Sequence, residues 1–148
     1  ARRDIKSTNL LAQVMAKHAA QVAGDYEALM IDQDGYVTEA GSSSFFYIRG
    51  NDLFVRPVTN EILHGITRQT MLRVAKQMNL KFVERIYKLD EVLEADEALI
   101  TASSIYVLPV SKIDDHVIAD GQAGPFTIAL RKAYLETARA EFYQAKPN

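Results

Sequence analysis

The sequence has 148 residues, of which 48% are hydrophobic and 24% are charged, and its formal net charge is −2. This is the size and composition of one globular domain. The charge is nearly balanced and there is no basic block, which argues against nucleic acid or an anionic membrane as the main partner. No apolar run approaches the roughly 20 residues of a membrane span. The chain has no cysteine, which excludes disulfides and thiolate metal sites and is compatible with a reducing cytosol. We expect a cytoplasmic protein.

The first half of the chain predicts one helix followed by several strands. Apolar residues at helical spacing predict an amphipathic helix over residues 7–23, and Gly24 is placed to end it. Strand-like segments and turn signals then alternate, which predicts an antiparallel meander. The predicted strands are residues 26–31, 36–39, 45–48 and 52–55, with turns at Asp34-Gly35 and Gly50-Asn51.

The second half mixes the two kinds of element. We expect helices over residues 65–78, 89–95 and 125–143, the last with Pro125 at a favoured first position, and strands over residues 81–86, 98–101 and 105–113. Turn signals stand at Asp114-Asp115 and Asp120-Gly121. Strands and helices do not alternate strictly, which predicts an α+β fold with a barrel-like mixed sheet and flanking helices.

The first candidate for chemistry is Lys6, in the stretch Asp4-Ile5-Lys6-Ser7. It lies where a short extended run meets a helix opened by Ser7, a residue type that caps helices. A lysine held by rigid elements on both sides can direct its amine into a cleft. Taken alone, it reads as a solvated surface charge, as most lysines are.

Glu39 is the second candidate. It stands at the end of a predicted strand and is followed by five small residues, Ala40 to Ser44, which leave room for a cleft. The alternative is a solvated glutamate in a hairpin.

Two further segments carry groups suited to an anion. Gly65 precedes a predicted helix start at Ile66 and Thr67, where free N–H groups and the helix dipole attract negative charge. Ser103 follows a predicted buried strand, at a position where hydroxyls often line a crevice. Each segment also reads as ordinary helix capping or a plain turn. His18, His64 and His116 have no metal-binding spacing, so we expect no metal site.

Taken together, these segments resemble the fold-type IV pyridoxal-phosphate enzymes, and among them most closely the D-amino-acid aminotransferases. The resemblance extends over residues 2–130 in the family's order. It is carried by Asp4-Ile5-Lys6-Ser7, Val37-Thr38-Glu39 with Ser42-Ser43-Ser44, Ile62-Leu63-His64-Gly65-Ile66-Thr67-Arg68, and Ala95-Asp96-Glu97 with Thr101 and Ser103.

The resemblance implies a role for each candidate. Lys6 matches the lysine that holds pyridoxal 5'-phosphate as a Schiff base and then shuttles the proton. Glu39 matches the carboxylate that pairs with the pyridine nitrogen. Leu63 matches the residue packed on the ring, while the phosphate is assigned to the helix start at Gly65, Ile66 and Thr67 and to Ser103. The implied reaction is transamination between a D-amino acid and a 2-oxo acid.

The resemblance also implies a second domain. Family members place a smaller domain before this region, and here only two arginines precede Asp4. We therefore expect residues 1–148 to be the large, C-terminal cofactor-binding domain, without the small N-terminal domain. We expect this domain alone to have weak enzymatic activity or none. A homodimer is the assembly that the family implies.

Other functions stay open at this stage. A branched-chain L-amino-acid aminotransferase usually has a Lys-x-x-x-Asn-Tyr-like pattern, which the residues after Lys6 fit less well. An aminodeoxychorismate lyase shares the lysine, the glutamate and the Gly-Ile motif. A different class of function is a non-catalytic fragment that binds a phosphorylated ligand.

Overall fold

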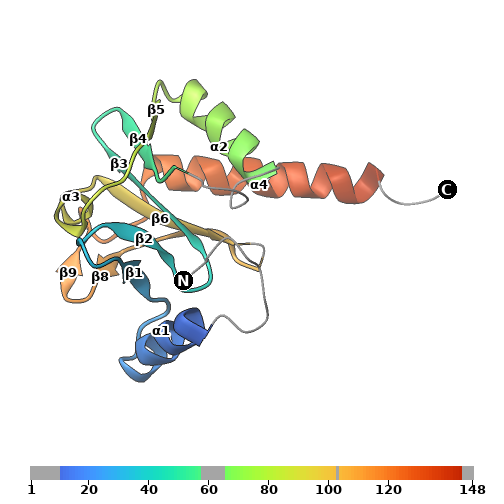
Figure 1. The fold of residues 1–148 in the computed structure, drawn as a ribbon. Coiled ribbons are helices and arrows are strands. Elements are labelled where there is room, and N and C mark those ends of the chain that lie inside the picture. Colours follow the sequence, from blue (N-terminus) through green and yellow to red (C-terminus); the bar gives the residue numbers. More distant parts are fainter. Residues whose placement is uncertain (1–10, 58–65, 103, 145–148) are drawn as a thin grey trace.

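The computed structural model describes residues 11–57, 66–102 and 104–144 (Figure 1). Its helices are α1 (Leu11–Val22), α2 (Ile66–Gln77), α3 (Leu89–Leu93) and α4 (Pro125–Gln144). Its strands are β1 (Leu29–Ile31), β2 (Val37–Ala40), β3 (Ser44–Arg49), β4 (Asp52–Val55), β5 (Lys81–Glu84), β6 (Glu97–Ala102), β7 (Tyr106–Pro109), β8 (Lys112–Ile113) and β9 (His116–Val117). The predicted mixed α+β character is confirmed.

A five-stranded sheet with the order β5-β4-β3-β6-β7 forms the centre of the molecule. The β4–β5 pair is parallel and the other three pairs are antiparallel. The largely antiparallel mixed sheet is therefore present. The barrel-like curl stays a prediction, because the described strands form this open sheet and two small two-stranded sheets.

The predicted meander is wrong in one respect. β2 pairs with β1, but it does not continue into the central sheet beside β3. β3 instead pairs with β4 on one side and with β6 on the other, with Ser44 opposite Thr101. All residues of β6 except the last are buried, so burial favours placing that strand inside the sheet rather than at its edge.

Side chains on the two faces of the sheet form two separate cores. On one face, α2 and α4 cover the sheet (Figure 1), and Met71 and Leu130 pack in one cluster with Leu53, Val55 and Leu99. The opposite face carries α3 and the β1–β2 hairpin, with Val37, Phe45, Tyr47 and Tyr87 in its core. The alternation of β3 fits both cores, because Phe46 and Ile48 point to the first and Phe45 and Tyr47 to the second.

The start of α4 is fixed by a buried carboxylate. The two carboxylate oxygens of Glu97 accept hydrogen bonds from the backbone N–H groups of Phe126 and Thr127, each at 2.9 Å, and from the Thr127 hydroxyl at 2.8 Å. These groups are donors that a helix N-terminus leaves free. Gly124 gives the carboxylate its space, since a Cβ there would overlap the end of the Glu97 side chain.

The region predicted as one strand over residues 105–113 is two shorter strands. β7 ends at Pro109, and Lys112 and Ile113 turn away to pair with Val117 and His116. The turn between β8 and β9 lies at the predicted Asp114-Asp115 signal, with Asp114 at φ 49°. The β8–β9 pair itself was not predicted.

Helix α1 ends as predicted but packs less than its pattern indicates. Gly24 adopts φ 83°, and the N–H of Asp25 bonds to the carbonyl of Ala20 at 2.8 Å. Among the residues of α1 only Ala20 is buried, while its large apolar side chains are exposed. Across the described part of the chain, we find no helix with the length and apolarity needed to cross a membrane.

Candidate functional site

Glu39 lies near the end of β2, where the sequence placed it. The turn at Asp34-Gly35 starts the strand, with Gly35 at φ 84° and the carboxylate of Asp32 accepting the N–H of Tyr36 at 2.9 Å. Glu39 is half-buried. No donor in the described part of the chain bonds to its carboxylate. A partly buried carboxylate without a donor from the protein can accept a charge-assisted hydrogen bond from the cationic N–H group of a bound ligand.

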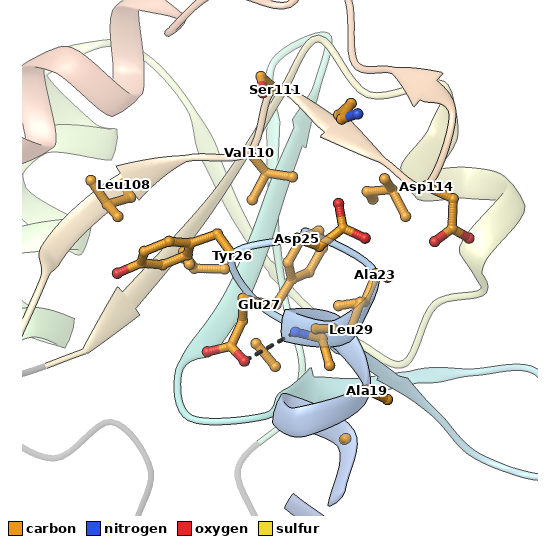
Figure 2. Close-up of a pocket in the computed structure, with 18 of the residues that line it drawn as sticks. Ala19, Ala23, Asp25, Tyr26, Glu27, Leu29, Leu108, Val110, Ser111 and Asp114 are labelled. Carbon is orange, nitrogen blue, oxygen red and sulfur yellow. Dashed lines mark hydrogen bonds between the residues drawn. The ribbon is translucent and has the colours of Figure 1, made fainter. Parts of the chain in front are cut away.

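The small residues after Glu39 have a definite partner, Glu27. One oxygen of its carboxylate accepts the N–H of Ser42 at 3.2 Å, the Ser42 hydroxyl at 2.6 Å and the Ser43 hydroxyl at 3.2 Å. The other oxygen accepts the N–H of Ala28 at 3.0 Å (Figure 2). A Cβ on Gly41 would lie 2.9 Å from the same carboxylate, which explains the need for small residues. Sequence analysis missed Glu27, because no local signal pairs it with a loop fifteen residues later.

The first turn of α2 has backbone N–H groups that the helix itself leaves without an acceptor. Ile66 is the first residue of the helix, Thr67 is half-buried, and the first turn has no acidic residue. Such an N-terminus attracts an anion through its unpaired N–H groups and its dipole. Arg68 forms an ion pair with Glu84 and lies over the ring of Phe82, 5.1 Å from the centroid.

Strand register brings these segments to one end of the central sheet. Ser44 at the start of β3 is opposite Thr101 near the end of β6, and Phe46 is opposite Val55 at the end of β4. Val55 in turn pairs with Glu84 at the end of β5, and Arg68 ties the start of α2 to Glu84. A short turn links Glu39 to the start of β3 at this end, and a hydrogen bond from the Ala40 N–H to the Ser43 carbonyl closes the turn. A carboxylate, a helix N-terminus and the end of a buried strand therefore adjoin one end of the sheet.

The turn after β6 is held in an unusual conformation. Tyr106 has φ 60°, a region that non-glycine residues rarely adopt. Arg131 of α4 donates to the carbonyls on both sides of it, Ile105 at 3.3 Å and Val107 at 2.5 Å, and the ring of Tyr134 packs 5.4 Å from that of Tyr106.

Four predicted site residues, Lys6, Leu63, Gly65 and Ser103, lie outside the described residues, as does the side chain of Ile66. Their roles stay predictions. His18 is exposed, and Nε2 of His116 lies 2.7 Å from the carbonyl oxygen of Leu93. In residues 11–57, 66–102 and 104–144 we find no group of three or more His, Cys, Asp or Glu side chains placed to hold a metal ion.

Shifted pKa values in the described part of the chain lie in the core beside β2 and on the adjoining surface. Burial raises the pKa of Tyr47 and of Tyr87, so both phenols stay neutral. The Tyr87 hydroxyl donates to the carbonyl of Phe45 at 3.2 Å, and the Tyr47 ring stacks on Phe54 at 4.5 Å. The hydrogen bond from Arg85 lowers the pKa of Glu91. These shifts have structural causes and do not identify an acid or base.

A cavity of about 750 Å³ lies elsewhere, between the end of α1, β1 and the connection from β7 to β8 (Figure 2). Its lining includes Tyr26, Leu108 and Val110, with Asp25 and Asp114 among the polar groups. Glu39, Ile66 and Thr67 do not line it. The cavity is therefore distinct from the candidate site, which we place from strand register and residue chemistry.

Residues 1–113 match the family model described as amino-transferase class IV. The chain belongs to this family. The D-alanine aminotransferase of Bacillus licheniformis is 41% identical over 140 residues, which are 95% of this chain and 49% of that protein. The D-alanine aminotransferase of Staphylococcus aureus (strain N315) is 37% identical over 133 residues, 90% of this chain and 47% of the relative. The chain thus spans about half the length of the curated relatives it matches.

Solved structures agree on the fold. The branched-chain amino acid aminotransferase from Thermobaculum terrenum in its PLP form has a TM-score of 0.82 and 30% identity, covering 95% of this chain and 47% of that one. The branched-chain aminotransferase from Thermoproteus uzoniensis with norvaline has a TM-score of 0.77 and 29% identity, covering 88% of this chain and 43% of that one. The family similarity inferred from the sequence motifs is confirmed.

Proposed function

We propose that residues 1–148 are the large, C-terminal cofactor-binding domain of a pyridoxal-phosphate-dependent aminotransferase that acts on D-amino acids. One observation supports the proposal: the Ala40–Ser43 turn joins Glu39, and the Arg68–Glu84 ion pair joins the start of α2, to the end of the sheet at which β6 finishes. The identity of 41% to a D-alanine aminotransferase supports the choice of D-amino acids. A barrel-like curl of the complete sheet belongs to the same proposal.

The residues present fit this cofactor. The half-buried Glu39 has no donor in the described part of the chain and would accept the N–H of a protonated pyridine ring. The N–H groups of Ile66 and Thr67 at the start of α2, with the Thr67 hydroxyl, would hold its phosphate. In the same proposal, Gly65 and Ser103 complete the phosphate site, Leu63 covers the ring face, and Lys6 binds the cofactor covalently.

The chemistry then divides between cofactor and protein. When bound, pyridoxal phosphate supplies a ring that accepts the electrons left when the substrate loses its Cα proton. The Lys6 amine would be the general base that takes the Cα proton of the substrate and the acid that later returns it. Glu39 would keep the ring nitrogen protonated through a charge-assisted hydrogen bond. The second half-reaction gives the amino group to a 2-oxo acid by the same steps in reverse.

The test of this function is transamination by the whole protein that contains these residues. D-alanine with 2-oxoglutarate should give pyruvate, and Lys6→Ala should abolish it while leaving the circular dichroism spectrum unchanged. L-leucine and L-valine serve as competing donors. Turnover with L-leucine and none with D-alanine would contradict the D-amino-acid assignment.

A branched-chain L-amino-acid aminotransferase is the second candidate. The specific observation in its favour is the structural similarity to two branched-chain aminotransferases, with TM-scores of 0.82 and 0.77. The same donor comparison separates the two candidates. A lyase of this family would instead release pyruvate from aminodeoxychorismate with no 2-oxo acid present.

The remaining expectations concern the chain alone and its assembly. We propose that the 148-residue chain turns over weakly or not at all, because the small domain would supply half of the cleft. If the chain binds cofactor without turnover even when joined to the rest of its protein, a non-catalytic binding role would replace the enzyme. A cytoplasmic homodimer is the proposed form of the whole protein, which sedimentation velocity tests.

A further inference from the structure

The strand that carries Glu39 is irregular just before that residue. Met30 of β1 pairs with Glu39 of β2, but the next residue, Ile31, pairs with Val37. Thr38 is therefore an extra residue, and the pair contains a β-bulge. Bulges change the direction of the side chains that follow them and are frequent beside active sites.

Burial shows what the bulge does to Glu39. Val37 and Ala40 both belong to the core on the α3 face of the sheet, although they are three residues apart. In a regular strand, Val37 and Glu39 would share a face, and Ala40 would lie on the opposite one. The extra residue restores Ala40 to the core and turns Glu39 out of it. Without the bulge, the carboxylate would enter an apolar core.

Three hydrogen bonds hold the chain in this form. The Thr38 hydroxyl donates to the Met30 carbonyl at 3.1 Å, and the Val37 N–H donates to the Tyr87 carbonyl at 2.9 Å. Nη1 of Arg56 donates to the Val37 carbonyl. The last bond crosses from the end of β4 in the central sheet to β2, which has no ladder to that sheet.

Arg56 is well placed to act as an anchor. It directly follows Val55, which is fully buried, so its backbone is fixed by the central sheet. In the described part of the chain, Arg56 makes no ion pair, and its guanidinium bonds to a backbone carbonyl two residues before Glu39. A charged donor on a carbonyl gives a stronger bond than a neutral one.

We propose that Arg56 is a positioning residue: by anchoring the Val37 carbonyl, it maintains the bulge at Thr38 and so directs the Glu39 carboxylate toward the ring nitrogen of the cofactor. This inference rests on the proposed function, in which Glu39 keeps that nitrogen protonated. Arg56 itself touches neither cofactor nor substrate in this account. Its substitution should therefore alter ring protonation and turnover more than substrate binding.

The experiment uses the whole protein reconstituted with pyridoxal phosphate labelled with ¹⁵N in the ring. The variants are Arg56→Met, which removes the donor, Arg56→Lys, which keeps a charged donor, and Glu39→Gln, which defines complete loss of the carboxylate. Arg49→Met is the matched control, because Arg49 pairs with Glu94 at 2.8 Å at the other end of β3. The readouts are the ¹⁵N shift of the ring nitrogen, kcat and KM, and amide hydrogen exchange of residues 37–40 in the cofactor-free protein.

Arg56→Met should move the ring ¹⁵N shift toward that of Glu39→Gln and lower kcat by about 10- to 100-fold, the scale that a small misplacement of a catalytic group causes. KM for the amino donor should change by less than about threefold, because uniform binding is untouched. Exchange of residues 37–40 should become faster. Arg56→Lys should recover most of the loss, and Arg49→Met should match the wild type.

Other outcomes separate the two claims. If Glu39→Gln changes the ¹⁵N shift and folded Arg56→Met does not, the role of Arg56 is refuted and the proposed function stands. If Glu39→Gln leaves the shift unchanged, the proposed function fails and this inference with it. Should Arg56→Met not fold, Thr38→Val replaces it, because it removes the hydroxyl bond to Met30 at nearly constant volume. A normal shift and normal exchange in Thr38→Val would then refute the inference.

Discussion

The two faces of the central sheet are completed in different ways. On the α2 and α4 face, long apolar side chains from both helices are fully buried against β4 and β6, with Leu130 at 0% exposure. On the other face, α1 buries only Ala20 and leaves Leu11 69% exposed, and a cavity of about 750 Å³ lies beside it. Both faces have an apolar core, but the helices of the first face are buried in theirs, whereas α1 on the second face stays largely outside it.

This difference bears on the candidate site. The strand that carries Glu39 belongs to the second face. Its Val37 carbonyl accepts a hydrogen bond from Arg56, which follows β4, and its Val37 N–H donates to the Tyr87 carbonyl. Glu27 holds the loop that follows this strand. Hydrogen bonds have preferred distances and angles and so orient the groups they join, whereas the hydrophobic effect is not directional. In the proposed function, these hydrogen bonds would set the direction of the Glu39 carboxylate.

The largest contrast should come from matched leucine truncations, one on each face. In the 148-residue chain, Leu130→Ala should lower the free energy of unfolding by about 2–5 kcal/mol, because it opens a cavity in a closed core. Leu11→Ala should cost about 0.5 kcal/mol or less, as is usual for exposed positions. Urea unfolding followed by circular dichroism measures both. Equal losses of unfolding free energy in the two variants would mean that Leu11 is buried in solution and that the two faces do not differ in this way.

A smaller loss of stability should follow from Gly124→Ala, on the face covered by α2 and α4. The added Cβ would overlap the end of the Glu97 side chain, so either the carboxylate or the start of α4 must move. We expect a loss of about 1–3 kcal/mol, typical of overpacking. In a double-mutant cycle, the shorter side chain of Glu97→Asp should recover part of this loss. Additive costs for the two substitutions would show that the contact does not set the helix start.

The smallest effect should be a dependence of the free energy of unfolding on pH, caused by an ion pair on the face that carries α3. Arg85 bonds to Glu91 at 2.6 Å and lowers the pKa of that carboxyl below its ordinary value of 4.5. A depressed folded pKa contributes stability that is complete above pH 4.5 and is lost as the pH falls through the folded value. The pair is partly exposed, so the contribution is below about 1 kcal/mol. Glu91→Gln should therefore lose less stability on acidification than the wild type in urea unfolding series, and identical losses would contradict the assignment.

Local patterns in the sequence predicted most elements and failed where distant segments meet. Residues 52–55 were predicted as a strand with the bounds that β4 has, and α4 begins at Pro125 as expected. The meander was wrong because β3 pairs with β6, about fifty residues along the chain, and short-range alternation carries no information on such a pairing. The amphipathic pattern of residues 7–23 likewise predicts an apolar face without specifying what covers it.

The candidate site divides in the same way. Glu39, Ile66 and Thr67 were proposed from motifs, and the elements that carry them adjoin one end of the sheet. Glu27 and Arg56 were missed, because a glutamate before a strand and an arginine after one have no distinctive pattern. Their hydrogen-bond partners lie far along the chain and become neighbours only in the folded protein. Glu27 binds the Gly41-Ser42-Ser43 loop, and Arg56 binds the backbone carbonyl of Val37 beside the bulge.

The proposed function requires that the Lys6 amine and the Glu39 carboxylate meet around one pyridoxal phosphate. The most direct measurement is borohydride reduction of the whole protein loaded with this cofactor, followed by peptide mass spectrometry. We expect the phosphopyridoxyl mass on the peptide that contains Lys6, and its loss in Lys6→Ala. A label on Lys17, whose amine donates to the Ser42 hydroxyl at 3.2 Å, or on no lysine at all, would contradict the account.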